Sequence, residues 1–122
     1  MFRDLAIDLG SATTSVVLRG EAEVLVEPSV VARVVGTGEV IAVGHRAARM
    51  VGRTPHEIET VQPFQGGSVV DFPAAQHLIR ALLRRAGVRR RHRVRAVACV
   101  PSAATSVERR AVADALRLAG AS

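Results

Sequence analysis

The spacing of apolar residues along the chain changes near Gly66-Gly67, and this change constrains the fold more than any other feature of the sequence. Before it, short apolar runs at residues 5–9, 16–18 and 23–27 end in turn residues, which predicts three strands in an antiparallel meander. After it, the spacing becomes helical. Strands followed by a helix, a strand and a helix predict an α/β fold with a mixed sheet and flanking helices.

A small insertion separates the two parts. Residues 30–35 and 40–43 flank Gly36-Thr37-Gly38 and predict a second hairpin. Residues 45–51 predict a short helix closed by Gly52, and residues 60–62 a short strand. Gly66-Gly67 reads as a loop.

The second part holds two amphipathic helices around one strand. Pro73 is well placed in a first helical turn, Asp71 is expected to start that helix, and Gly87 ends it. Residues 96–100 predict a buried strand, in which Cys99 acts as a small hydrophobic residue. Thr105 and Glu108 have capping-box spacing before the last helix. The inward stripe expected for the first helix consists of Ala75, Leu78, Ile79, Leu82, Leu83 and Ala86.

The composition narrows the class of protein. The 122 residues fit one domain, and without Trp or Tyr its core must be aliphatic. No signal peptide opens the chain, and no apolar run approaches the ~20 residues that span a bilayer. A single cysteine excludes an internal disulfide. We therefore expect a soluble, cytoplasmic bacterial protein.

Positive charge is concentrated in one segment. All 17 basic residues are arginine, and eight of them fall within residues 80–95, which contain no acid. Such a segment is ordinarily a solvated helix end and loop, but it can attract an anionic membrane surface. Nucleic acid is not favoured, because no binding module and no interleaved aromatic residues are present. The residues expected to contact a membrane surface are Arg84, Arg85, Arg89, Arg90, Arg91 and Arg93.

Residues 8–15 are the candidate ligand-binding segment of the chain. Asp8 ends a strand, and Gly10 opens a turn of small and hydroxyl residues whose N–H groups can cradle an anion. Asp8 would then hold the hydration shell of Mg²⁺ by accepting hydrogen bonds from its waters. The alternative is an ordinary hairpin turn. The segment is not a P-loop, because it lacks the lysine.

Residues 8–14 resemble the first phosphate loop of the ATPases that include actin, sugar kinases and heat-shock chaperones. Further stretches resemble the MreB/Mbl family of rod shape-determining proteins, the bacterial actin homologues. They occur in family order over essentially the whole chain, at residues 27–32, 42–44, 50–55, 69–72, 99–102 and 107–112.

The resemblance implies part of an actin-like (ribonuclease H-like) ATPase domain. Residues 1–29 and 70–122 would form subdomain IA, and residues 30–69 the small α+β subdomain IB. It implies ATP and Mg²⁺ as cofactors, and filament-forming relatives and the cell-wall synthesis machinery as partners. The implied cofactor-binding residues are Asp8, Gly10, Ser11, Ala12 and Thr13, with Asp8 reaching the metal through water.

Two departures qualify this expectation. Thr13 stands where the family usually has Asn, and the chain has about a third of the family length. The parts that complete hydrolysis are absent from these 122 residues, so we assign no catalytic residue and expect weak or no ATP binding. The alternatives are a gene fragment without activity and a basic module that binds lipid or nucleic acid through its arginines.

Overall fold

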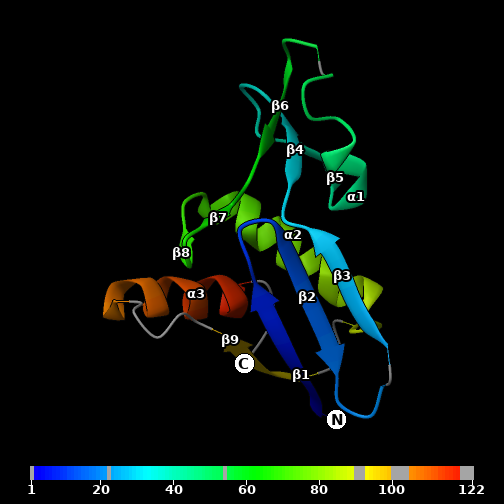
Figure 1. Ribbon diagram of the computed structural model, residues 1–122, viewed down its shortest axis with the longest axis vertical. Helices are drawn as coiled ribbons and strands as arrows, with labels where there is room; N and C mark the ends of the chain where they lie inside the picture. The colour runs from blue at the N-terminus through cyan, green and yellow to red at the C-terminus, as the bar shows by residue number, and fades with distance from the viewer. Residues whose placement is uncertain (1, 22, 54, 90–92, 100–104, 119–122) are drawn as a thin grey trace.

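The computed structural model describes residues 2–21, 23–53, 55–89, 93–99 and 105–118 (Figure 1). Its first sheet has the order β3-β2-β1-β9. The strands β1 (Phe2–Leu9), β2 (Thr13–Leu18) and β3 (Val24–Pro28) form the predicted antiparallel meander. Strand β9 (Arg93–Cys99) pairs with β1 in parallel, so the sheet is mixed, as predicted.

Strand β9 corrects two details of the prediction. It begins at Arg93, three residues before the expected start, because residues 93–95 extend the ladder with β1. Its expected end, Val100, lies outside the described residues. Cys99 is exposed rather than buried, because side chains alternate along β9 and Cys99 lies on the face opposite to that of buried Val94.

The second sheet is antiparallel and has the order β5-β4-β6. It contains β4 (Val31–Val34), β5 (Val40–Val43) and β6 (Ile58–Val61). Helix α1 (His45–Ala48) follows β5 and is shorter than predicted. The expected loop at Gly66-Gly67 is instead the turn of a small hairpin, β7 (Phe64–Gln65) and β8 (Ser68–Val69). Both glycines adopt positive φ angles, 57° and 84°, as tight hairpin turns require.

Helix α2 (Phe72–Arg85) begins and ends as its sequence predicts. The Asp71 side chain accepts a hydrogen bond of 3.1 Å from the Ala74 N–H and so caps the first turn. At the other end, the Val88 N–H donates to the Leu83 carbonyl at 2.9 Å. Gly87 between them has a φ of 91°, which completes a Schellman motif.

Helix α3 (Ser106–Leu118) starts with the predicted capping box. The Glu108 N–H donates to Thr105 Oγ1 at 3.1 Å, and Glu108 Oε1 accepts from the Thr105 N–H at 2.9 Å. The Ser68 hydroxyl of β8 also donates to Glu108, which lowers the pKa of that carboxyl together with the bonds from Thr105. The cap thereby connects α3 to the small hairpin.

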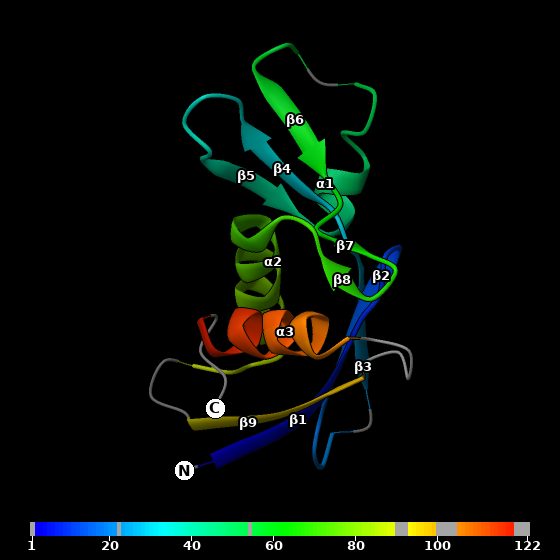
Figure 2. The same cartoon turned by 90° about the vertical axis from the view of Figure 1, so that its left-hand side faces the viewer.

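Helices α2 and α3 lie on one face of the first sheet and bury the main core against it (Figure 2). The strands contribute Leu5, Ile7, Val16 and Val94 to this core. A smaller core joins α1 to the second sheet; it consists of Val30, Ala32, Ala42 and Ala47. Within the described residues, each helix is too short or too polar to cross a membrane.

Candidate functional site

The turn between β1 and β2 brings together the residues that the sequence singled out, Gly10, Ser11, Ala12 and Thr13. The Gly10 N–H donates to the Thr13 carbonyl at 3.0 Å and closes the turn. A Cβ atom on Gly10 would lie 2.6 Å from that carbonyl oxygen. Glycine is therefore required here by the turn itself, before any ligand is considered.

A buried serine holds this turn from below. Ser29 Oγ donates to the Gly10 carbonyl at 2.7 Å, and the Ser29 N–H donates to the Ala12 carbonyl at 2.9 Å. Thr14 Oγ1 lies 2.7 Å from Ser29 Oγ. Because a serine has one hydroxyl hydrogen, which Ser29 gives to Gly10, Thr14 must be the donor of this bond. Both side chains are fully buried, so the turn rests on a satisfied polar network.

Sequence reasoning assigned no role to Ser29. Its contacts are to residues 15 and 19 positions earlier in the chain. The sequence does show that Ser29 directly follows Pro28, the last residue of a strand. Spacing along the chain, however, does not identify the residues that Ser29 contacts.

The side of the turn that faces away from buried Ser29 and Thr14 is open to a ligand. Ser11, Ala12 and Thr13 are exposed. Since the Gly10 carbonyl points at Ser29, the trans peptide directs the Ser11 N–H to the opposite side. Ser11 Oγ accepts a hydrogen bond of 3.1 Å from the Gly66 N–H, so its own hydrogen can be donated elsewhere. These donors fit the oxygen atoms of a phosphate group.

Asp8 ends β1 with its side chain exposed beside this turn. In the ladders it lies opposite Ser15 on β2 and Cys99 on β9. Among the described residues, no three His, Cys, Asp or Glu side chains gather as they would around a directly bound metal ion. One exposed carboxylate fits a contact to a hydrated cation rather than a closed coordination shell.

A second polar cluster surrounds Glu27 on β3. This side chain is only 3% exposed. Its carboxylate forms an ion pair with Arg85 of α2 and lies 2.9 Å from Nε2 of His45 on α1. Gly44 approaches it closely: a Cβ there would lie 2.5 Å from Glu27 Oε1. The cluster connects the first sheet to α1 and α2, two residues before the serine that holds the turn.

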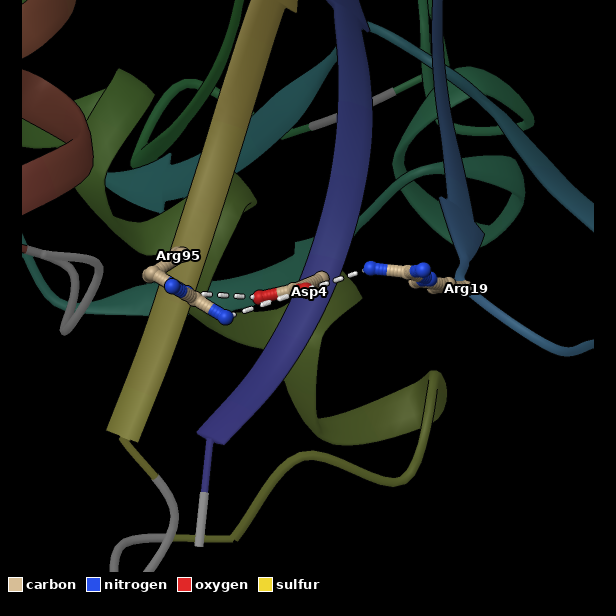
Figure 3. A network of polar contacts seen from close by, with 3 residues as sticks. All are labelled: Asp4, Arg19 and Arg95. Carbon is tan, nitrogen blue, oxygen red and sulfur yellow. Dashed lines mark hydrogen bonds and ion pairs between the residues drawn. The ribbon is translucent and has the colours of Figure 1, made fainter.

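Two arginines of the arginine-rich segment pair with acids in different parts of the fold. Arg85 pairs with Glu27, whereas Arg95 on β9 pairs with Asp4 through contacts of 2.8 and 3.2 Å (Figure 3). Arg19 also reaches Asp4, at 3.4 Å. The hydrogen bonds from Arg95, followed by its charge and those from Arg19, hold the pKa of Asp4 below its ordinary value despite some desolvation.

The remaining arginines of the predicted membrane contact differ in what the structure describes. Arg84, Arg89 and Arg93 are exposed. Arg90 and Arg91 lie outside the described residues. The segment contains eight arginines and no acid in the sequence, but in the fold Glu27 approaches Arg85 and Asp4 approaches Arg95.

The family model described as MreB/Mbl protein matches residues 2–122. The chain is 42% identical over 126 residues to the cell shape-determining protein MreB of Escherichia coli K12. It is 38% identical over 119 residues to the cell shape-determining protein Mbl of Bacillus subtilis 168. Both alignments cover 97% of this chain but 36% of the relative, so the chain spans about a third of the length of these relatives.

Solved structures of related proteins have the same fold as this chain over about a third of their own length. MreB5 of Spiroplasma citri bound to ADP superposes on the whole chain with a TM-score of 0.87 and 30% identity, over 36% of its own length. The same protein bound to AMPPNP gives a TM-score of 0.82 over 37% of its length. A MamK double helical filament, at 20% identity and a TM-score of 0.81, shares the fold over 96% of this chain and 38% of its own.

Proposed function

Because the chain belongs to the MreB/Mbl family and has a partial actin-like fold, we propose that it is a cell-shape protein whose turn at residues 10–13 contacts nucleotide phosphates. One observation carries the proposal. The turn presents exposed donors on one side while buried Ser29 and Thr14 fix it from the other. A turn held in this way has its donors in place before the ligand arrives, which reduces the entropy lost on binding.

The proposed phosphate contacts are the N–H groups of Ser11, Ala12 and Thr13 and the hydroxyls of Ser11 and Thr13. Gly10 contributes the shape of the turn, because its N–H donates to the Thr13 carbonyl. Asp8, beside them, accepts hydrogen bonds from the waters around Mg²⁺. The metal, when bound, neutralises phosphate charge. ATP is the proposed nucleotide, in keeping with the ADP and AMPPNP in the names of the two MreB5 structures. Thr13 has a hydroxyl where the family usually has the amide of Asn. Its side chain therefore offers one donor hydrogen instead of two.

We assign the two sheets to the two parts of domain I. Residues 1–29 and 70–122 would be the subdomain IA-like part, which contains the phosphate turn. Residues 30–69 would be the subdomain IB-like insertion. The division is supported by the two separate sheets. The main core reaches from the first sheet to Val31 of the second, and the Glu27 cluster also joins the two parts.

These 122 residues would supply one wall of a nucleotide cleft. We therefore expect the isolated chain to bind Mg-ATP weakly and to lack hydrolysis, and we assign it no catalytic residue. The proposed setting is the bacterial cytoplasm, close to the membrane, with MreB-like proteins and the cell-wall synthesis machinery as partners.

A titration with Mg-ATP tests the phosphate contact directly. Amide NMR signals of Ser11, Ala12 and Thr13 should shift and approach saturation, and Asp8→Ala should weaken the response that depends on Mg²⁺. Asp114→Ala, an acid on α3, is the matched control and should leave the titration unchanged. Absence of saturable shifts at the turn up to about 10 mM nucleotide would contradict the proposal.

A second candidate function is binding of an anionic membrane surface by the arginine-rich segment. Arg84, Arg89 and Arg93 are exposed. In addition, Arg80, Arg84 and His77 line a surface hollow of about 430 Å³ beside the turn that contains Gly38 and Glu39. Each arginine near anionic lipid contributes on the order of 1 kcal/mol.

Vesicles with and without anionic lipid test this candidate by co-sedimentation. Replacing Arg89, Arg90, Arg91 and Arg93 with serine should remove most binding and leave the circular dichroism spectrum unchanged. Added salt should weaken binding of the parent chain, because the Debye length falls from ~10 Å at 0.1 M to ~3 Å at 1 M. Binding that ignores both changes would rule this candidate out.

A further inference from the structure

Among the described residues, three polar or charged side chains are buried, and all three lie next to the turn at residues 10–13 or on the strands that continue from it. Thr14 and Ser29 are fully buried, and Glu27 is 3% exposed. Thr14 and Glu27 lie opposite each other in the ladder of β2 and β3, and Thr14 shares a hydrogen bond with Ser29. The hydrogen bonds of Thr14 and Ser29 explain why these two are buried, whereas Glu27 is not yet explained.

Stability alone does not account for a buried carboxylate on β3. Removing a charge from water is costly, and a buried ion pair can often be replaced by apolar residues of similar volume without loss of stability. A charged group differs from an apolar one in that its contacts are directional. The burial of Glu27 is therefore better explained by a need to hold the end of β3 in one position.

The two carboxylate oxygens of Glu27 are held from two different helices. Oε1 pairs with Arg85 in the last turn of α2, and Oε2 lies 2.9 Å from Nε2 of His45 at the start of α1. Directly before α1, the Gly44 N–H donates to the Val30 carbonyl at 2.9 Å. The chain is thus anchored at the end of β3 and again just after it.

The link from Glu27 to the turn is short and stiff. Only Pro28, whose ring restricts its φ angle, separates Glu27 from Ser29. Ser29 in turn donates through its hydroxyl to the Gly10 carbonyl and through its N–H to the Ala12 carbonyl. A displacement of Glu27 would therefore carry Ser29 with it.

Through Ser29, this link reaches two of the proposed phosphate contacts. The Gly10 carbonyl shares a trans peptide with the Ser11 N–H. The Ala12 carbonyl shares one with the Thr13 N–H. Because Ser29 bonds both carbonyls, it sets the direction in which both N–H groups point.

We propose that Glu27 is a positioning residue for the turn at residues 10–13 and that it acts through Ser29. Arg85 and His45 hold the carboxylate, and the carboxylate holds the end of β3 where Ser29 meets the turn. This role rests on the proposed function of the turn as a phosphate contact. It makes the affinity of the turn depend on a buried charge that does not itself touch the ligand.

Amide hydrogen exchange tests the positioning without any nucleotide. The N–H groups of Gly10 and Ser29 report directly on the turn, because both donate to its carbonyls. Glu27→Gln keeps the size of the side chain but removes its charge, so it should accelerate exchange of both groups about fivefold or more. Arg85→Ala should act in the same direction while Glu27 stays in place.

Val94→Ala is the control for a general loss of stability. Val94 is buried on β9 and lies opposite Arg3, at the far end of β1 from the turn. Denaturant unfolding measures the global stability of each variant, so that exchange can be compared with it. Val94→Ala should lower global stability yet accelerate exchange at Gly10 and Ser29 less than Glu27→Gln does. Equal acceleration in these two variants, or none in Glu27→Gln and Arg85→Ala, would overturn the proposal.

A Mg-ATP titration of the parent chain at constant pH supplies a readout that needs no variant. The imidazole NMR signals of His45 should shift with the same apparent dissociation constant as the Ser11 amide, because coupling between two sites is reciprocal. His56, an exposed histidine before β6, is the matched control and should not respond. In Glu27→Gln the dissociation constant should rise about threefold or more.

The outcomes of this titration separate the two proposals. A Ser11 signal that saturates while His45 stays unchanged would overturn the role of Glu27 and leave the phosphate contact intact. An unchanged dissociation constant in Glu27→Gln would do the same. A Ser11 signal that does not respond would contradict the proposed function, and amide exchange would then decide whether Glu27 holds the turn.

Discussion

The turn at residues 10–13 and the arginine-rich segment at residues 80–95 are both unusual in the sequence, yet the fold treats them differently. The turn is short, and its neighbours converge on it: Ser29 and Thr14 lie beneath it and Gly66 beside it. The arginines diverge. Arg85 points to Glu27 on the helical side of the first sheet, and Arg95 pairs with Asp4.

The difference arises because the turn is one local structure, whereas the arginines belong to several elements. A two-strand turn keeps adjacent residues together, so its local pattern survives folding. A charged segment that spans a helix end, a loop and a strand sends successive side chains in different directions. A sequence pattern therefore predicts a site well when one local structure holds it, and poorly when its residues belong to several elements.

The largest effect is expected for Ser29→Ala. This change removes the donor to Gly10 and leaves buried polar groups of the turn without a partner, which should cost about 2 kcal/mol of unfolding free energy. Amide hydrogen exchange of Gly10 to Thr13 should accelerate. Denaturant unfolding and exchange NMR measure the two effects.

Ser106→Ala is the control for this prediction, since Ser106 is an exposed serine at the start of α3. Its unfolding free energy should change by less than about 0.5 kcal/mol. If Ser29→Ala were equally mild and left exchange in the turn unchanged, the turn would be held by the strand ladder alone. The contrast with the arginine-rich segment would then disappear.

The next effect in size separates two neighbouring arginines in the last turn of α2. Arg85→Ala removes an ion-pair partner of buried Glu27, but the Arg85 side chain is 42% exposed and solvent screens the attraction, so the change should cost about 1 kcal/mol. Arg84→Ala removes an exposed cation from the same turn and should cost less than about 0.5 kcal/mol. Thermal and denaturant unfolding of both variants provide the comparison. Equal losses would mean that Arg85 stabilises only the end of the helix.

Much of the fold could be predicted because its signals are local. The cap at Asp71, the capping box at Thr105 and the termination at Gly87 each depend on residues within four positions. The hairpin at Gly66-Gly67 was missed, since strands of two residues are too short to show a period.

The exposure of Cys99 was also missed, for a different reason. An apolar strand of five residues does not reveal which of its faces the rest of the domain covers. Likewise, the pairing of Glu27 with Arg85 joins residues 58 positions apart, beyond the reach of spacing arguments. In both cases the missing information is the relative placement of whole elements.

A third prediction concerns how the stability of the fold depends on pH through Asp71, at the start of α2. Burial raises the pKa of Asp71, but the hydrogen bond from Arg33, the cap to Ala74 and the Arg33 charge outweigh it and lower the pKa overall. The folded-state pKa therefore lies below the ordinary value of 3.8. The corresponding stability is present above that value and is lost as pH falls through the folded-state pKa.

Unfolding free energies measured from neutral pH down to about pH 3 should show this loss, and Asp71→Asn should flatten part of the slope. The asparagine can still cap the helix, so the variant isolates the charge from the cap. A slope identical to that of the parent chain would show that other carboxyls account for the acid sensitivity.

The smallest effect is expected for Asp4→Asn in the row Arg95–Asp4–Arg19. The pKa of Asp4 is lowered by Arg95 first and Arg19 second, but both guanidinium groups are mostly exposed and solvent screens the attraction. Stability should therefore change less than in Ser29→Ala, Arg85→Ala or Asp71→Asn, as measured by denaturant unfolding. A loss as large as that of Arg85→Ala would show that exposure does not separate the weak ion pairs of this fold from the strong ones.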